Sequence, residues 1–333
     1  MLALSAVASS IAALAERAWR QRIDAIIKPD DVRPLSDRSL RDTIFLLGLL
    51  WAEIAALLCV ANLLPQISLW WSVVVGLILV LLISTRINAL NVVVHEGSHG
   101  FLAPSRGLND RLTNVGAAWW TLSSVQEYRP THRLHHRYLG EERDPDRPSY
   151  LIPERRGAFA LLLLQDVIGL TAVRRGIVLV LGAREDEGAT GENVGLALLG
   201  KVATQLVVLG QFVLIQGPLL GIGFYCAFWL FPLLCIFPLI LRLKTITEHF
   251  DQRLRESGRQ LWIARTSCAG WLQNHLLGAR MEYHFEHHVL PNIPYRGLRE
   301  LHRQLNDAGM FDQHAELLSG GYVRFLSSLA SDV

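Results

Sequence analysis

Four long apolar segments limit the folds that this chain can adopt. They cover residues 43–64, 69–94, 194–216 and 219–241, and none holds more than one charged side chain. A helix rises about 1.5 Å per residue, so about 20 apolar residues cross the roughly 30 Å hydrocarbon core of a bilayer. The chain is 51% hydrophobic and only 19% charged, which is too apolar for an ordinary soluble protein. We therefore predict an all-α integral membrane protein with four transmembrane helices.

Eight of the twelve histidines gather in three short boxes. The first box holds His95 and His99, the second holds His132, His135 and His136, and the third holds His284, His287 and His288. On a helix, residues at i, i+3 and i+4 share one face, so each box can direct its imidazoles at one point. Neutral imidazole binds iron, copper, zinc and nickel, and eight ligands are too many for one ion but suit two. A single HxxxH pattern usually means little, but three boxes beside apolar segments predict a dinuclear metal centre.

The number of spans predicts which side of the membrane carries the boxes. Four spans place all three boxes and both termini on one face, whereas five would separate the boxes. Residues 17–41 hold seven lysines and arginines, while the connections at 61–69 and 217–218 hold none. Because short cytoplasmic segments are enriched in Lys and Arg, we expect a cytoplasmic, histidine-rich cap that carries the metal site. This cap is formed by residues 95–193 and 242–333.

The domain organisation follows from the same pattern. Residues 1–42 are predicted to form a cytoplasmic, amphipathic N-terminal segment on the membrane surface, and residues 43–333 a single membrane domain. If the second apolar segment continues unbroken to His99, it has about 31 residues and projects the first box into water. Arg86 lies near the level where a long side chain is expected to snorkel to the lipid headgroups.

The remaining segments are predicted to be interfacial helices, a loop and a kinked helix. Residues 112–125 are apolar but too short to span, and residues 158–181 include three charges that would each cost about 2.5–3.5 kcal/mol at the bilayer centre. We therefore expect both segments to lie at the interface, followed by a solvated loop at 183–193. Pro232 and Pro238 are expected to kink the fourth span. The four cysteines show no paired spacing, so no disulfide is predicted.

From Asn91 to Asp307 the sequence resembles the membrane-bound di-iron fatty acid desaturases and hydroxylases. The resemblance rests on the three boxes and on GEERDPD at 140–146, TEHF at 247–250 and LPNIPYRGLRELH at 290–302. It implies an oxygen-dependent enzyme whose two iron ions are held by the eight box histidines and by His249 as a ninth ligand. It also implies that a lipid-linked fatty acyl chain is desaturated with dioxygen as co-substrate. Glu282 departs from the asparagine that related chains often have there.

The box spacing leaves the type of reaction open. The same site suits a hydroxylase or ketolase that acts on an acyl chain, a sphingoid base or a carotenoid. An alternative of another class is a non-catalytic membrane protein that binds metal or haem. A transporter is expected to place polar ligands near the membrane midplane, and a bis-histidine haem needs only two histidines. The boxes lie outside the apolar segments, which favours the enzyme.

We expect the electrons to come from a separate carrier. The chain shows no Gly-rich dinucleotide fingerprint and no cluster-binding cysteine run, so a ferredoxin, a rubredoxin or a cytochrome b5-type donor with its reductase is predicted. A basic surface suits an acidic donor, although it also suits anionic lipid; it includes Arg133, Arg137, Arg296, Arg299 and Arg303. No nucleic-acid partner is predicted. Because no retention or transit signal is visible, a bacterial inner membrane is the expected location.

Overall fold

The computed structural model describes residues 17–182, 191–255, 262–278 and 281–332. Within these ranges the regular structure is helical, and strand-like pairing is limited to isolated bridges that Thr266 forms with Tyr283 and Leu318. The chain forms two compact units. We call Ser39–Tyr128 with Ala160–Leu241 the apolar unit, and Met1–Arg38 with Arg129–Phe159 and Arg242–Val333 the histidine unit.

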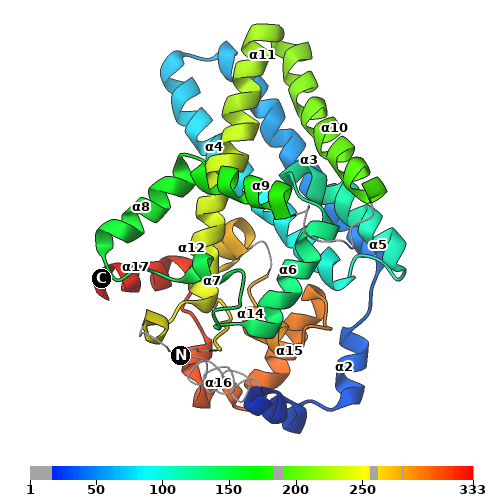
Figure 1. Cartoon of the computed structure of the whole chain (residues 1–333), viewed down its shortest axis with the longest axis vertical. Helices are drawn as coiled ribbons and strands as arrows, with labels where there is room; N and C mark the ends of the chain where they lie inside the picture. The colour runs from blue at the N-terminus through cyan, green and yellow to red at the C-terminus, as the bar shows by residue number, and fades with distance from the viewer. Residues whose placement is uncertain (1–16, 183–190, 256–261, 279–280, 333) are drawn as a thin grey trace. The chain divides into compact units, whose positions relative to one another are not determined.

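Two long helices begin the apolar unit. α3 (Leu40–Leu63) and α4 (Leu69–His99) are joined by the 3-10 turn η1 (Leu64–Gln66) and pack side by side (Figure 1). Ser39 caps the start of α3, where its hydroxyl accepts a hydrogen bond from the backbone N–H of Asp42 at 3.3 Å. α4 runs unbroken for 31 residues, as the sequence predicts. It ends at Gly100, which has a φ of 85°, a left-handed conformation that glycine adopts without steric cost.

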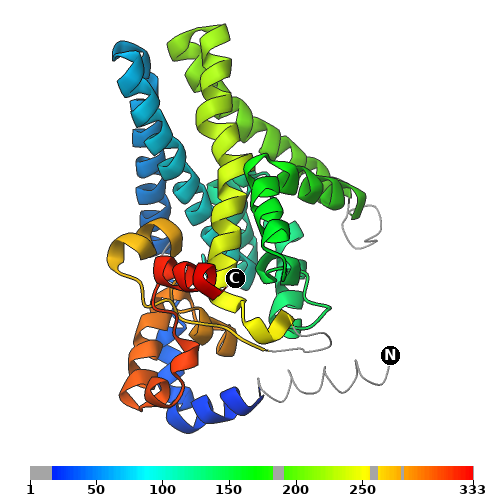
Figure 2. The same ribbon diagram turned by 90° about the vertical axis from the view of Figure 1, so that its left-hand side faces the viewer.

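The second pair of long helices is a close hairpin. α10 (Gly191–Gln216) and α11 (Pro218–Tyr225) are joined by Gly217 alone, and Figures 1 and 2 show them in green as neighbouring helices. Gly221 lies so near α10 that a Cβ there would be 2.6 Å from the Cα of Val213. Only glycine permits this separation, because the neighbouring atoms belong to backbone and cannot rotate away.

The helix that follows passes two prolines. α11 continues through the π-helical segments η4 (Cys226–Leu230) and η5 (Pro232–Ile236) into α12 (Phe237–His249), which ends in the histidine unit. η4 ends two residues before Pro232. η5 begins at Pro232 and ends two residues before Pro238. Proline lacks an N–H and clashes with the carbonyl one turn earlier, so a locally wider turn accommodates it. Where the sequence predicts a kink, the structure shows these widened turns.

Four helices are long and apolar enough to cross a membrane. They are Leu40–Gln66, Leu69–His99, Val194–Gln216 and Pro218–His249. The prediction of an all-α fold with four candidate membrane spans is therefore confirmed for the described residues. Their core is a cluster of buried aliphatic and aromatic side chains that includes Ile54, Ile83, Phe212 and Trp229.

Three local predictions were wrong. Residues 158–181 do not form one helix, because α8 (Arg156–Val167) and α9 (Leu170–Gly182) are separated by Gly169 with a φ of 78°. Arg156–Val167 and Leu170–Gly176 are bent by 70° and would make a fifth span only if taken together. Arg86 does not snorkel: it is buried and bonds Glu53 of α3 at 2.6 Å, since a paired charge costs less among apolar helices than an unpaired one.

The third wrong prediction concerns the loop at 183–193. Residues 183–190 lie outside the described residues, but α10 already begins at Gly191, so the end of the predicted loop is helical. Of the predicted N-terminal amphipathic segment, residues 1–16 also lie outside the described residues, whereas residues 17–26 are helical. The apolar unit also contains the short elements α5 (Arg106–Thr113), η2 (Asn114–Ala118) and η3 (Trp119–Thr121).

The histidine unit is built from shorter helices. It contains α2 (Pro29–Leu35), most of α6 (Val125–Tyr138), α7 (Arg147–Tyr150), η6 (Gln252–Arg255), α13 (Trp271–Gln273), η7 (Asn274–Gly278), α14 (His284–Val289), α15 (Tyr295–Asp307), α16 (Met310–Gln313), η8 (Ala315–Leu317) and α17 (Tyr322–Asp332). α2 packs against α15 (Figures 1 and 2). Phe285 and Leu301 are fully buried, so the apolar faces of α14 and α15 help to form the core that holds the histidines.

Candidate metal centre

Three elements of the histidine unit carry the candidate ligands. The second box lies on α6, the third box lies on α14, and His249 is the last residue of α12. In each box the histidines stand at i, i+3 and i+4, so helix formation alone places them on one face. These helices are far apart in the sequence, and their packing brings the three sets of imidazoles together.

Four histidines form a buried cluster. His135, His249, His284 and His288 each offer one ring nitrogen within 4.8 Å of the others. Nε2 of His284 lies 2.9 Å from Nε2 of His249 and 3.1 Å from Nε2 of His288. With a metal–nitrogen distance of about 2.1 Å, two ligands at a right angle lie about 3.0 Å apart, and two tetrahedral ligands about 3.4 Å apart. The spacing therefore fits imidazoles that converge on one ion.

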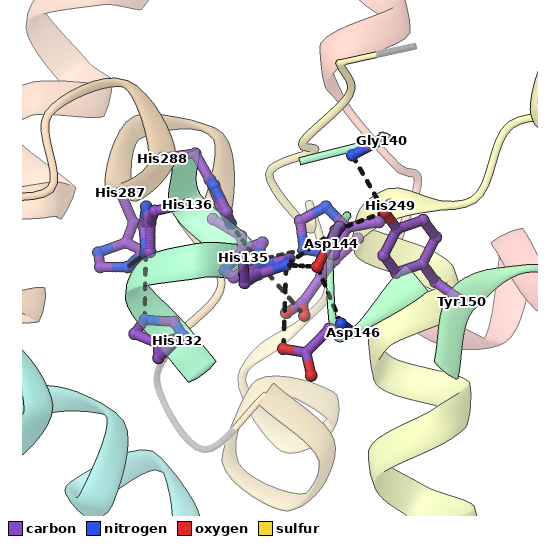
Figure 3. Close-up of polar contacts among 12 residues, drawn as sticks. His132, His135, His136, Gly140, Asp144, Asp146, Tyr150, His249, His287 and His288 are labelled. Carbon is purple, nitrogen blue, oxygen red and sulfur yellow. Dashed lines mark hydrogen bonds and ion pairs between the residues drawn. The ribbon is translucent and has the colours of Figure 1, made fainter. Parts of the chain in front are cut away.

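The ring orientation of two cluster members is set by hydrogen bonds at the other nitrogen. Nδ1 of His135 lies 3.0 Å from Oδ1 of Asp144 (Figure 3), and Nδ1 of His249 donates to the carbonyl of Ile263 at 2.9 Å. A carboxylate and a carbonyl only accept, so the proton sits on Nδ1 and the lone pair of Nε2 faces the cluster. Such partners fix the tautomer of metal-binding histidines. Asp144 lies in the GEERDPD segment at 140–146, whereas the carbonyl of Ile263 carries no sequence signal.

The electrostatic environment differs between the histidines. Burial lowers the pKa of His288 well below its usual value, so this ring is neutral at pH 7 and offers a lone pair. Burial also opposes the protonation of His135, but the hydrogen bond to Asp144 and the charge of Asp146 outweigh it and raise the pKa of His135. At His135, therefore, protons compete with a metal ion more strongly than at His288.

A second group of histidines lies in the same unit. His132, His136 and His287 each offer a ring nitrogen within 4.8 Å of the others. Nε2 of His136 is 3.1 Å from Nε2 of His132 and 3.1 Å from Nε2 of His287. The seven histidines that the sequence predicts as ligands in this unit thus fall into one group of four and one group of three.

The first box belongs to the apolar unit. His95 and His99 lie in the last turn of α4, with their ring centroids 5.1 Å apart. His95 is buried, and the αL conformation of Gly100 ends the helix directly after His99. That these two histidines bind the same metal centre stays a prediction.

Glu286 stabilises the third box from the opposite side. It lies two residues after His284 and therefore about 200° around α14, away from the histidine face. It is fully buried, and its carboxylate accepts hydrogen bonds from Nδ1 of His302 at 2.5 Å and from the hydroxyl of Thr266. The helical angle of Glu286 was readable from the sequence, but its two partners were not.

Two other glutamates that lie near candidate ligands in the sequence, Glu127 and Glu248, have different partners. Glu127 lies in the apolar unit, where it accepts a hydrogen bond from Lys201 at 2.6 Å. Glu248 accepts a hydrogen bond from Lys244, while its other oxygen lies 3.8 Å from Nε2 of His284. Tyr150 was missed by the sequence reasoning. Its hydroxyl donates to Asp144 at 2.6 Å, and burial raises the pKa of Tyr150 far above its usual value, which keeps the donor protonated.

These groups define a helical protein with a nitrogen-rich candidate metal site and four candidate membrane spans. A sequence profile described as fatty acid desaturase matches residues 68–315, most of the chain and all nine predicted ligands. The chain belongs to the fatty acid desaturase family.

A curated relative agrees with this assignment. The chain is similar to the dihydrorhizobitoxine desaturase of Bradyrhizobium elkanii, with 26% identity over 237 residues, which cover 68% of this chain. The matched region spans 65% of the length of that relative.

Proposed function

We propose that this chain is a membrane oxidoreductase that uses two iron ions, dioxygen and an external electron donor to desaturate a lipid-linked fatty acyl chain. The observation that carries the proposal is the buried cluster of His135, His249, His284 and His288. Membership of the fatty acid desaturase family supports the type of reaction.

The donor set fits iron. All the ligand atoms of the two groups are imidazole nitrogens, which suit iron, copper, zinc and nickel, and the family favours iron among these. We propose the four-histidine cluster as one iron site. For the second iron site we propose His132, His136 and His287, and the sequence pattern assigns His95 and His99 of the first box to it as well.

The iron centre would supply the oxidising power, derived from dioxygen, that removes hydrogen from an unactivated carbon chain. In the balanced reaction the substrate loses two hydrogens and a C–C single bond becomes a double bond. Two electrons from the donor and two protons from solvent combine with these hydrogens and dioxygen to give two waters. The described residues contribute by holding the metal ligands in position. Asp144 and the carbonyl of Ile263 orient two rings, and Glu286 anchors α14.

The position of His249 supports a lipid substrate. It is the last residue of the candidate span Pro218–His249, so one ligand lies at the end of a helix of membrane-spanning length. A substrate that is itself part of the bilayer reaches such a site without entering water. The name of the Bradyrhizobium elkanii protein gives dihydrorhizobitoxine as its substrate, and for this chain we propose an acyl chain instead. Hydroxylation or ketolation of an acyl chain, sphingoid base or carotenoid remains the alternative.

The donor and the location are further parts of the proposal. We propose a ferredoxin, rubredoxin or cytochrome b5-type donor with its reductase, and an active site on the cytoplasmic face of a bacterial inner membrane. The seven basic residues between positions 17 and 41 support this orientation.

Lipid mass spectrometry on cells that express the chain with a general reductase system tests the reaction. Wild type is expected to form a lipid that is lighter by two hydrogens, and His287→Ala is expected to abolish it. His275→Ala is the matched control, because its ring stacks on Trp271 and belongs to neither histidine group. A lipid heavier by one oxygen would establish the hydroxylase instead. Purified wild type without bound iron, or with one haem per chain, would refute the di-iron proposal.

A further inference from the structure

Tyr150 is linked to two members of the four-histidine cluster at once. It is fully buried, and its ring lies against that of His249 with the ring centroids 5.3 Å apart. Its hydroxyl bonds Asp144, the carboxylate that holds Nδ1 of His135 (Figure 3). Tyr150 lies outside the boxes and motifs that identify the family in this sequence.

The hydrogen bonds of Asp144 show what the hydroxyl contributes. Oδ1 accepts from the backbone N–H of Asp146 at 2.9 Å and lies 3.0 Å from Nδ1 of His135. Oδ2 lies 3.1 Å from the same Nδ1 and accepts from the Tyr150 hydroxyl at 2.6 Å. Each carboxylate oxygen of Asp144 therefore accepts from one donor besides Nδ1 of His135: Oδ1 from the Asp146 N–H and Oδ2 from the Tyr150 hydroxyl. These two donors fix the carboxylate at both of its oxygens. A buried carboxylate with all its donors in place has one favoured orientation.

The hydroxyl is itself held in place. It accepts a hydrogen bond from the backbone N–H of Gly140 at 3.1 Å, so its own proton is directed toward Asp144. Gly140 follows α6, the helix that carries His135, and has a φ of 79°. The connection between α6 and α7 thus brings Tyr150, Asp144 and His135 into one hydrogen-bonded series. This series lies entirely within the histidine unit.

We propose that Tyr150 is a positioning residue for the metal centre, which acts through Asp144 to set the tautomer and the direction of the His135 ring. The inference rests on the proposed function, because it requires that the four-histidine cluster binds metal. Without the hydroxyl, Oδ2 keeps only the shared Nδ1–H, and the carboxylate is free to turn away from the ring. Nε2 of His135 would then face the other three histidines for a smaller fraction of the time.

The test is Tyr150→Phe in the purified full-length chain, stripped of metal and titrated with Co²⁺ against a chelator. Phenylalanine keeps the ring against His249 and removes only the hydroxyl. We expect a Co²⁺ affinity about ten-fold weaker, at the lower end of the 10–100-fold range for partners of metal ligands, and a changed visible absorption of the bound cobalt. Tyr138→Phe is the matched control, because Tyr138 lies on α6 but its ring packs against the guanidinium of Arg143.

A double-mutant cycle separates positioning from a general effect on folding. If Tyr150 acts through Asp144, adding Tyr150→Phe to Asp144→Asn leaves the Co²⁺ affinity within about two-fold of that of Asp144→Asn alone. Additive losses, or a Tyr150→Phe protein that is less stable but binds Co²⁺ like wild type with the same spectrum, would overturn the inference. If Tyr150→Phe does not fold, 3-fluorotyrosine at position 150 replaces it, since it strengthens the donor. An unchanged cobalt spectrum would then count against the inference.

The same titration distinguishes the two levels of the argument. Wild type that binds no Co²⁺ refutes the metal centre and this inference together. Wild type that binds Co²⁺, with a Tyr150→Phe variant of equal affinity and spectrum, refutes only the role of Tyr150.

Discussion

Replacing His249 tests whether the ninth histidine is a metal ligand. His249 is fully buried, its Nε2 lies 2.9 Å from Nε2 of His284, and its Nδ1 is held by the carbonyl of Ile263. We chose His249→Gln because glutamine fills much of the same volume and its amide N–H can still donate to Ile263. The variant thus removes the lone pair that faces the cluster with little loss of packing.

The size of the effect follows from the number of ligands. Binding of a metal ion by four protein ligands is worth about 10–16 kcal/mol in small structural sites, or roughly 3 kcal/mol per ligand. Since 1.4 kcal/mol corresponds to a factor of ten, His249→Gln is expected to weaken metal binding at the four-histidine cluster about 100-fold. The three-histidine group contains no atom of His249 and should retain its affinity.

Metal content after a chelator challenge measures this loss. Detergent-purified wild type and His249→Gln are dialysed against a graded series of chelator concentrations, and bound iron is measured by mass spectrometry. The variant should lose one equivalent of metal per chain at a chelator concentration that leaves wild type loaded. His275→Gln serves as the control for loss of a histidine outside both groups. A His249→Gln protein that retains metal as wild type does would refute the assignment of His249 as a ligand.

Three further outcomes follow from the structure. Gly221→Ala forces a Cβ to within 2.6 Å of the Cα of Val213, whereas the Cβ of Gly223→Ala meets nothing within 4 Å. Only Gly221→Ala should therefore destabilise the fold, by about 1–3 kcal/mol, and lower the melting temperature. Equal melting temperatures for the two variants would show that the α10–α11 contact is looser than described. Burial alone would raise the pKa of Asp251, but the hydrogen bonds from Arg253 outweigh burial, and the pKa in the folded protein is lower than in the unfolded chain. The Asp251 carboxylate therefore stabilises the fold above about pH 4, and this stabilisation is lost as the pH falls through the folded-state pKa. The melting temperatures of wild type and Asp251→Asn should therefore differ at pH 7, and the difference should shrink as the pH is lowered below 4; a constant difference would contradict the pairing. Removing metal with a chelator should lower the melting temperature of wild type. The corresponding loss in the free energy of unfolding is about 2.7 kcal/mol if the free metal concentration was 100 times the dissociation constant. An unchanged melting temperature would show that folding and metal binding are uncoupled.

The errors of the sequence reasoning have a common cause. Hydropathy located the spans but assigned Arg86 to the headgroups, since it cannot reveal that Glu53 on the neighbouring helix lies 2.6 Å away. The charges in residues 158–181 argued against a span, but the break at Gly169 depends on a left-handed glycine that no composition rule identifies. Tyr150 was missed because its role depends on a hydrogen bond to Asp144, and an isolated tyrosine has no pattern.

The sequence by itself determined the four apolar helices and the three boxes, because hydropathy and the 3.6-residue helical repeat are properties of neighbouring residues. It therefore predicted an all-α chain with candidate membrane spans and a nitrogen-rich metal site. Only the tertiary structure decided how the box histidines and His249 are divided, with His135, His249, His284 and His288 in one cluster and His132, His136 and His287 in another. Metal coordination requires atoms to converge within a few ångströms, and for residues on separate helices, such as His249 and His284 or His136 and His287, that convergence is set by the packing of α6, α12 and α14.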